Sequence, residues 1–243
     1  MIISLINQKG GVGKTTSCLN LGASLAALGK RILLIDLDPQ YNLTSILLKE
    51  EPEQSIYSFY NKEVDSLSKI INELDKFDLI TSDIRLAGIE RRNDINNYFL
   101  LREELKKLNE NYDYILIDCP PSLGVMTMSA LIASNFLIIP VKTEFLSLKG
   151  IEQLIETFTE IRKIHNPTLA IMGVLFTMFE KRRNLDREIV KSIDYLPVLN
   201  TIIRKNVDVA ESPGAFQPIS DYNPNSVGAE DYLNLAKEIM NHE

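Results

Sequence analysis

The residues best suited to chemistry lie near the start of the chain, in the run Lys-Gly-Gly-Val-Gly-Lys-Thr-Thr at residues 9–16. An apolar run at residues 2–6 precedes it, and leucines and alanines recur at helical spacing after it. The glycines let the backbone turn tightly and direct several N–H groups toward one anion, at the positive end of the helix that follows. This order of strand, glycine loop and helix predicts a polyphosphate site.

The loop is a variant of the phosphate-binding pattern G-x-x-x-x-G-K-[ST], without its first glycine and with an additional lysine, Lys9. In the common pattern a lysine, here Lys14, neutralises the β and γ phosphates, and a hydroxyl, here that of Thr15, is a ligand of Mg²⁺. A glycine turn with two solvated lysines is the alternative, and the flanking strand and helix disfavour it. The predicted ATP contacts are Lys9, Gly10, Gly11, Val12, Gly13, Lys14, Thr15 and Thr16.

Two further apolar runs end in carboxylates. Residues 31–35 lead into Asp36-Leu37-Asp38-Pro39-Gln40, and residues 114–117 lead into Asp118 and the sequence Cys-Pro-Pro-Ser. Ligands of open α/β folds bind at the carboxyl ends of the strands, so we expect Asp118 beside the phosphate loop, holding Mg²⁺. The simpler alternatives are that Asp38 caps the turn before Pro39 and that Asp118 caps a helix.

The pattern as a whole predicts an α/β fold with a doubly wound, mainly parallel sheet and helices on both faces. Residues 136–141 and 170–178 are further short apolar runs of the kind found in buried parallel strands. Between about residues 42 and 111 we expect amphipathic helices with one short strand at 77–81. The 243 residues, 45% of them hydrophobic, suffice for a single domain spanning 1–243.

The segment at residues 9–16 resembles the deviant Walker A loop of the ParA/MinD/iron-protein group of P-loop ATPases. The Asp-x-Asp-Pro-Gln run at residues 36–40 and the Asp-Cys-Pro-Pro-Ser run at 118–122 resemble most the ParA/Soj partitioning branch. The resemblance implies an ATP-dependent sandwich dimer in which Lys9 reaches the phosphates bound by the partner subunit. It also implies that Asp38 polarises the attacking water, with Lys9, Lys14 and Asp38 as catalytic residues and Thr15, Asp38 and Asp118 at the metal.

Other segments carry the same resemblance with less detail. Residues 142–150 are similar to a family segment in which an acid, here Glu144, contacts nucleotide across the dimer. Asn206 and Pro213 match positions that border the adenine. Residues 86–90 resemble a dimer-facing helical segment.

Charge limits how this chain could bind DNA. It carries 26 Lys and Arg against 33 Asp and Glu, a net charge of −7, so any DNA contact must be local. Residues 173–208 hold seven basic and five acidic side chains, and the resemblance implies nonspecific DNA binding there in the ATP-bound dimer. The candidates are Arg182, Arg183, Arg204 and Lys205, with a solvated basic face as the alternative. Asp208, Asn225 and Val227 stand where the family has cations.

The motifs predict an ATPase that uses ATP and Mg²⁺. The resemblance implies that it forms a homodimer with ATP, segregates DNA by binding nonspecific double-stranded DNA, and releases that DNA when a ParB-like partner stimulates hydrolysis. The alternatives are a MinD-like or cargo-positioning ATPase that acts through proteins alone, a redox ATPase like the nitrogenase iron protein, and a ligase that activates a carboxylic acid. We expect a cytoplasmic protein without disulfides that associates with the nucleoid when ATP is bound. We do not expect it to bind membranes, because the last helical stretch is acidic.

Overall fold

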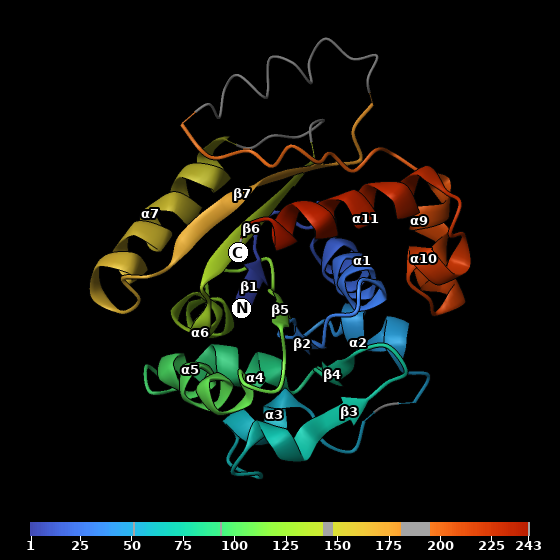
Figure 1. The fold of residues 1–243 in the computed structure, drawn as a ribbon. Coiled ribbons are helices and arrows are strands. Elements are labelled where there is room, and N and C mark those ends of the chain that lie inside the picture. Colours follow the sequence, from blue (N-terminus) through green and yellow to red (C-terminus); the bar gives the residue numbers. More distant parts are fainter. Residues whose placement is uncertain (51, 93, 143–147, 181–194, 243) are drawn as a thin grey trace.

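A seven-stranded sheet forms the centre of the molecule in the computed structural model, which describes residues 1–50, 52–92, 94–142, 148–180 and 195–242 (Figure 1). The strand order is β3-β4-β2-β5-β1-β6-β7. All neighbours pair in parallel except β3 and β4, which are antiparallel. The strands are β1 (Ile2–Leu5), β2 (Ile32–Asp36), β3 (Ile71–Glu73), β4 (Asp78–Ile80), β5 (Tyr114–Asp118), β6 (Phe136–Lys142) and β7 (Ala170–Thr177).

The central strands β1, β2 and β5 are buried along their whole length and are apolar except for Ser4, Asp36 and Asp118, because both faces of the sheet are covered. Successive residues of a strand point to opposite faces, and β2 shows this plainly. Its Leu33 and Ile35 pack into one buried cluster, while Ile32 and Leu34 pack into the other. The sheet thus separates two hydrophobic cores.

Helices from different parts of the chain cover the two faces (Figure 1). One core is closed by α3 (Ile56–Tyr60), the 3₁₀ turn η1 (Leu67–Ile70), α4 (Leu86–Arg92), α5 (Asn97–Leu108), α6 (Val125–Ala133) and α7 (Leu148–Ile164). The other is closed by α1 (Lys14–Ala27), α2 (Asn42–Leu47), α10 (Ile219–Tyr222) and α11 (Val227–Met240), with α9 (Val207–Glu211) and the 3₁₀ turn η3 (Ser212–Ala215) beside them. The predicted doubly wound α/β class is confirmed.

One local prediction is wrong. Residues 42–111 contain two strands rather than one, because residues 71–73 form β3 at the edge of the sheet. The apolar pair Ile70 and Ile71 has a spacing that also suits a helix, but Ile70 ends a 3₁₀ turn and Ile71 pairs with Ile80 of β4. Pairing with β4 overrides the weak local preference of this short segment.

Candidate ATP site

The candidate site lies where β1, β5 and β2 end side by side. Leu5 is in register with Asp118, and Asp118 is in register with Asp36. The loop after β1 crosses this edge and enters α1 at Lys14. The strand order therefore brings together three segments that are far apart in sequence, as expected for the carboxyl edge of a parallel sheet.

The loop owes its shape to glycine and to one asparagine. Gly11 and Gly13 have φ values of 70° and 86°, in the left-handed region that favours glycine. Asn7 accepts a hydrogen bond from the Lys9 backbone N at 2.9 Å and donates from Nδ2 to the Pro140 carbonyl at 2.8 Å. Thr177, at the end of β7, donates to the Val12 carbonyl at 2.8 Å. The loop is thus tied to β6 and β7, and neither Asn7 nor Thr177 had been predicted, because nothing in the local pattern marks them.

Lys14 points its ammonium group back into the loop. The side chain is buried, and Nζ donates to the Lys9 carbonyl at 3.2 Å. Burial lowers the pKa of Lys14, while the nearby Asp118, Cys119 and Asp38 act to raise it. Within the described residues this is the one hydrogen bond of the buried ammonium group, so Lys14 is poised to gain from an incoming phosphate.

Thr15 and Asp118 fit a magnesium ion. The Thr15 hydroxyl donates to Asp118 Oδ2 at 2.6 Å, and Oδ1 is one of three buried side-chain atoms without a hydrogen-bond partner among the described residues. Burial is the largest cause that raises the pKa of Asp118, and the charge of the nearby Asp36 carboxylate is the second. Among the described residues no group of three His, Cys, Asp or Glu side chains could hold a metal by itself. This donor set suits Mg²⁺, which is held by few protein oxygens and completes its shell with phosphate and water.

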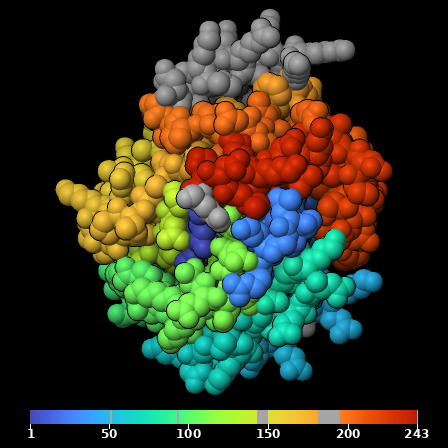
Figure 2. Space-filling model, viewed as in Figure 1, coloured from blue at the N-terminus to red at the C-terminus, as the bar shows by residue number. Residues whose placement is uncertain are grey.

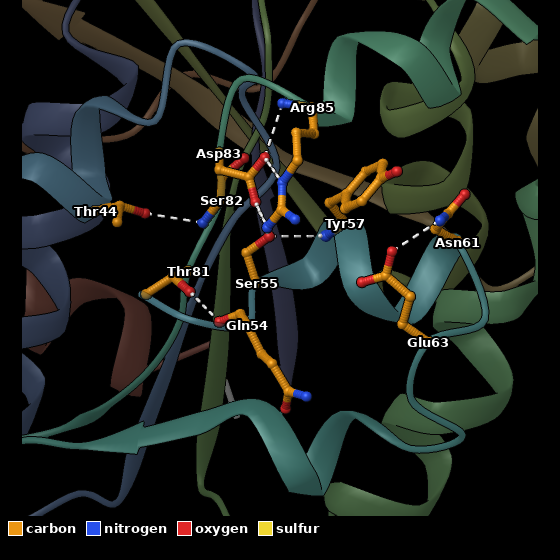
Figure 3. A network of polar contacts seen from close by, with 10 residues as sticks. All are labelled: Thr44, Gln54, Ser55, Tyr57, Asn61, Glu63, Thr81, Ser82, Asp83 and Arg85. Atoms are coloured by element: carbon orange, nitrogen blue, oxygen red, sulfur yellow. Dashed lines mark hydrogen bonds and ion pairs between the residues drawn. The ribbon is translucent and has the colours of Figure 1, made fainter. Parts of the chain in front are cut away.

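Asp36 has a structural role beside this pair. It is fully buried and accepts from Asp38 N at 3.0 Å, from Thr44 N at 2.9 Å and from the Thr44 hydroxyl at 2.8 Å. The Thr44 hydroxyl in turn accepts from Ser82 N at 2.9 Å, a contact drawn in Figure 3. Burial nevertheless raises the pKa of Asp36 to about 7. Asp36 thus links the segment after β2 to α2 and to the end of β4.

Asp38 lies at the same edge and is buried. Its Oδ1 accepts from the Gln40 backbone N at 2.9 Å, and its carbonyl accepts from Tyr41 N at 2.8 Å. The carboxylate therefore does stabilise the turn around Pro39, as the simpler alternative suggested. A second role toward water or metal stays a prediction.

An apolar cavity of about 470 Å³ opens directly beside the loop. Gly13 and Thr16 line one side, and Asn206 and Tyr232 are among the residues lining the rest. Asn206 also caps α9, because its Oδ1 accepts from Val209 N at 3.1 Å. Tyr232 bonds the Ser17 hydroxyl at 3.2 Å, which fixes α11 against α1, and the two helices adjoin at the surface (Figure 2). An apolar cavity next to a phosphate loop suits a nucleotide base, and Pro213 is not among its lining residues.

Known proteins resemble this chain along its whole length. A family model described as an AAA domain matches residues 1–171. The sporulation initiation inhibitor protein Soj of Bacillus subtilis is 44% identical over 98% of this chain and 97% of its own length. The chromosome partitioning protein ParA of Caulobacter vibrioides is 36% identical over 100% and 94% of the two chains. The chain belongs to the ParA/Soj family of partitioning ATPases.

A solved structure shares the fold of this ParA/Soj ATPase. A crystal structure of cobyrinic acid a,c-diamide synthase from Mycobacterium smegmatis, with a bound ATP analogue and magnesium, matches with a TM-score of 0.86. It is 32% identical and covers 99% of this chain and 94% of that one. The predicted family and ATPase class are confirmed. No described helix of this ParA/Soj ATPase has the length and apolar character needed to cross a membrane.

Of the four predicted DNA-contacting residues of this ParA/Soj ATPase, two form ion pairs and two lie outside the described residues. Arg204 donates to Asp231 from Nε at 2.9 Å and to Glu230 at 2.7 Å, and these hydrogen bonds raise its pKa. Lys205 is paired with Glu180 at 2.5 Å. Arg182 and Arg183, like Glu144, lie outside the described residues. All of these contacts stay predictions.

Proposed function

We propose that this protein is a nucleotide switch that binds Mg-ATP, closes into a homodimer and then binds DNA without sequence specificity. Hydrolysis, stimulated by a ParB-like partner, opens the dimer and releases the DNA. The observation that carries the proposal is the loop at residues 9–16, in which a second lysine, Lys9, accompanies the buried Lys14 beside Asp118.

In this proposal the residues of the site divide the work. Lys14 and the loop N–H groups hold the phosphates, while Thr15 and Asp118 hold Mg²⁺, which neutralises charge on the β and γ phosphates. Asp38 orients the attacking water. Lys9 supplies positive charge to the nucleotide of the partner subunit, as an arginine finger does in other NTPases. Closure of the dimer then depends on the γ phosphate, so the dimer forms with ATP and not with ADP.

The first experiment is DNA binding by Asp38→Ala, a variant chosen because it should bind ATP without turnover. We expect it to bind arbitrary duplex DNA with ATP and not with ADP. The logarithm of the binding constant should fall as the logarithm of the salt concentration rises, with a slope of roughly −0.9 for each phosphate neutralised. An ATP-dependent dimer that binds no DNA would rule out the DNA switch. It would leave a cargo-positioning ATPase that acts through a protein partner.

A ligase is the second candidate, because the cobyrinic acid a,c-diamide synthase structure is similar over nearly the whole chain. A ligase would hydrolyse ATP only when a carboxylic acid substrate is added. ATP turnover by the protein alone, or with DNA and the partner protein, would exclude it. An iron–sulfur role is disfavoured because Cys18 and Cys119 are fully buried, and burial raises the pKa of both thiols well above the usual value.

A further inference from the structure

Glu90 of α4 is bonded to the first turn of a different helix. Its Oε2 accepts from Val125 N at 2.9 Å and its Oε1 accepts from Met126 N at 3.0 Å. Both amides belong to the start of α6, where backbone N–H groups have no partner within the helix. A carboxylate at this end is also favoured by the helix dipole. Glu90 therefore provides the cap that α6 does not obtain from its own N-cap residue.

That N-cap residue is Gly124, and it leaves the space that Glu90 occupies. A Cβ atom built on Gly124 would lie 1.9 Å from Glu90 Oε2 and 2.8 Å from its carboxyl carbon. Gly124 has φ −90°, which any residue can adopt, so backbone strain does not explain the glycine. The close approach of the Glu90 carboxylate does.

The bond fixes one end of a segment whose other end is in the ATP site. Residues 119–124 connect Asp118 to α6, and Cys119 N donates to the Leu5 carbonyl at 3.3 Å at the Asp118 end. Between these two ends, Pro120 and Pro121 have no N–H group that could anchor the backbone through a hydrogen bond. The Ser122 carbonyl accepts from the Thr127 hydroxyl at 2.6 Å, which ties the segment to the first turn of α6. Glu90 ties that turn to α4.

The electrostatics agree with this location. Burial raises the pKa of Glu90, its two backbone hydrogen bonds lower it, and the charge of Asp38 raises it further. Glu90 therefore lies close enough to the segment after β2 to respond to Asp38.

We propose that Glu90 is a positioning residue of the ATP site: it holds residues 120–124, between Asp118 and α6, in the place that turnover requires, and it couples this segment to α4. Glu90 itself touches neither phosphate nor metal. A displacement of α4 moves the Glu90 carboxylate and releases the segment. The catalytic part of this inference rests on the proposed function, and the anchoring part does not.

The test uses Glu90→Gln, Glu90→Ala, Gly124→Ala and the double variant Glu90→Ala/Gly124→Ala in the full chain. Glu103→Gln, on the exposed face of α5, is the matched control. Each variant is measured for kcat and KM of ATP hydrolysis, for binding of a fluorescent ADP, and for hydrogen exchange of the peptide covering residues 119–128. ADP binding reports that the variant is folded.

We expect Glu90→Gln to lower kcat by roughly tenfold to a hundredfold while ADP affinity and KM change by less than about threefold. Exchange of the 119–128 peptide should become faster. Gly124→Ala should lower kcat similarly, because its methyl group displaces the carboxylate. In the Glu90→Ala background the same methyl group should change kcat by less than about twofold, since nothing remains to displace.

Three results would overturn the inference. Unchanged exchange in Glu90→Gln would show that the carboxylate does not anchor the segment. Faster exchange with an unchanged kcat, or additive effects of Glu90→Ala and Gly124→Ala, would reduce Glu90 to an ordinary helix cap. If the unmodified protein hydrolyses no ATP under any condition, the proposed function fails, and the exchange comparison still decides the anchoring.

Discussion

The phosphate-loop edge of the sheet and the basic region at the end of β7 both carry many charges, but the charges are held differently. At the edge, the described part of the chain gives Lys14 one hydrogen bond, to a carbonyl, and gives Asp118 Oδ1 no hydrogen-bond partner. Near β7, Arg204 is paired with two carboxylates and Lys205 with one. The first region holds charges that a ligand would satisfy, whereas the second holds charges that the protein has already neutralised.

The difference shows why an acidic protein can combine a strong phosphate site with conditional DNA binding. Buried charges without partners are costly in the free protein, so ligand binding recovers that cost. Surface ion pairs are worth little and can be exchanged for phosphate contacts. Four predictions test this contrast.

Lys14→Ala should have the largest effect. Removing the buried ammonium group should lower ATP turnover by roughly 10²- to 10³-fold, since the charge that develops on the transferred phosphate loses its nearest cation. Steady-state phosphate release measures it. Lys30→Ala, beyond the end of α1, is the control and should be unchanged. Equal effects of the two substitutions would contradict the assignment of the loop.

Asp118→Asn should separate function from stability. Turnover should fall by roughly tenfold to a hundredfold and should need more Mg²⁺, because one metal-binding oxygen is lost. The nucleotide-free protein should be no less stable, because a buried charge with an unpaired oxygen is removed. Thermal unfolding without and with Mg-ATP measures both effects, and a large loss of stability without ligand would show that Asp118 is mainly structural.

Asp36 should make the nucleotide-free protein less stable as the pH rises. Its pKa is raised to about 7 in the fold from an ordinary 3.8, so between these values the folded state keeps a proton that the unfolded state releases. The free energy of unfolding should therefore fall with pH in this window, by at most about 1.4 kcal/mol per pH unit, and level off above it. Urea unfolding at several pH values, with Asp36→Asn as reference, measures this slope. Equal slopes in the two proteins would contradict the prediction.

Arg204→Ala should act more on stability than Lys205→Ala. Arg204 also donates its backbone N to Asp231 at 2.8 Å, and Asp231 is nearly buried, with a relative exposure of 4%. Loss of the guanidinium leaves that carboxylate with fewer partners, at a cost of roughly 1–2 kcal/mol, against about 0–1 kcal/mol for the exposed Lys205 pair. Chemical unfolding measures both. If Lys205→Ala weakens ATP-dependent DNA binding while Arg204→Ala does not, the DNA contact lies with Lys205.

The sequence was sufficient for the parts of the fold that depend on local pattern. Strands buried on both faces must be apolar, and the apolar runs therefore predicted the six parallel strands. The glycine loop predicted the phosphate site. It could not predict β3, because residues 71–73 are a strand only through pairing with β4. Pattern alone also did not show that Thr44 satisfies Asp36, or that Asp118 Oδ1 lacks a hydrogen-bond partner among the described residues.

Contacts between distant segments were the other part that pattern could not reach. Asn7, Thr177 and Tyr232 hold the loop and α1 in place through partners more than a hundred residues away. Glu90 lies in a segment that resemblance marked for another reason, and its bonds to α6 follow only from the packing of α4. Such residues are identified by what they touch.

The most direct test of the central claim is the mass in solution of Asp38→Ala and of Lys9→Ala/Asp38→Ala, each with Mg-ATP and with Mg-ADP, by sedimentation. The account predicts a dimer only for Asp38→Ala with ATP, and monomers in the other three samples. A full ATP-dependent dimer in the double variant, or a dimer that forms equally with ADP, would contradict a switch closed by Lys9.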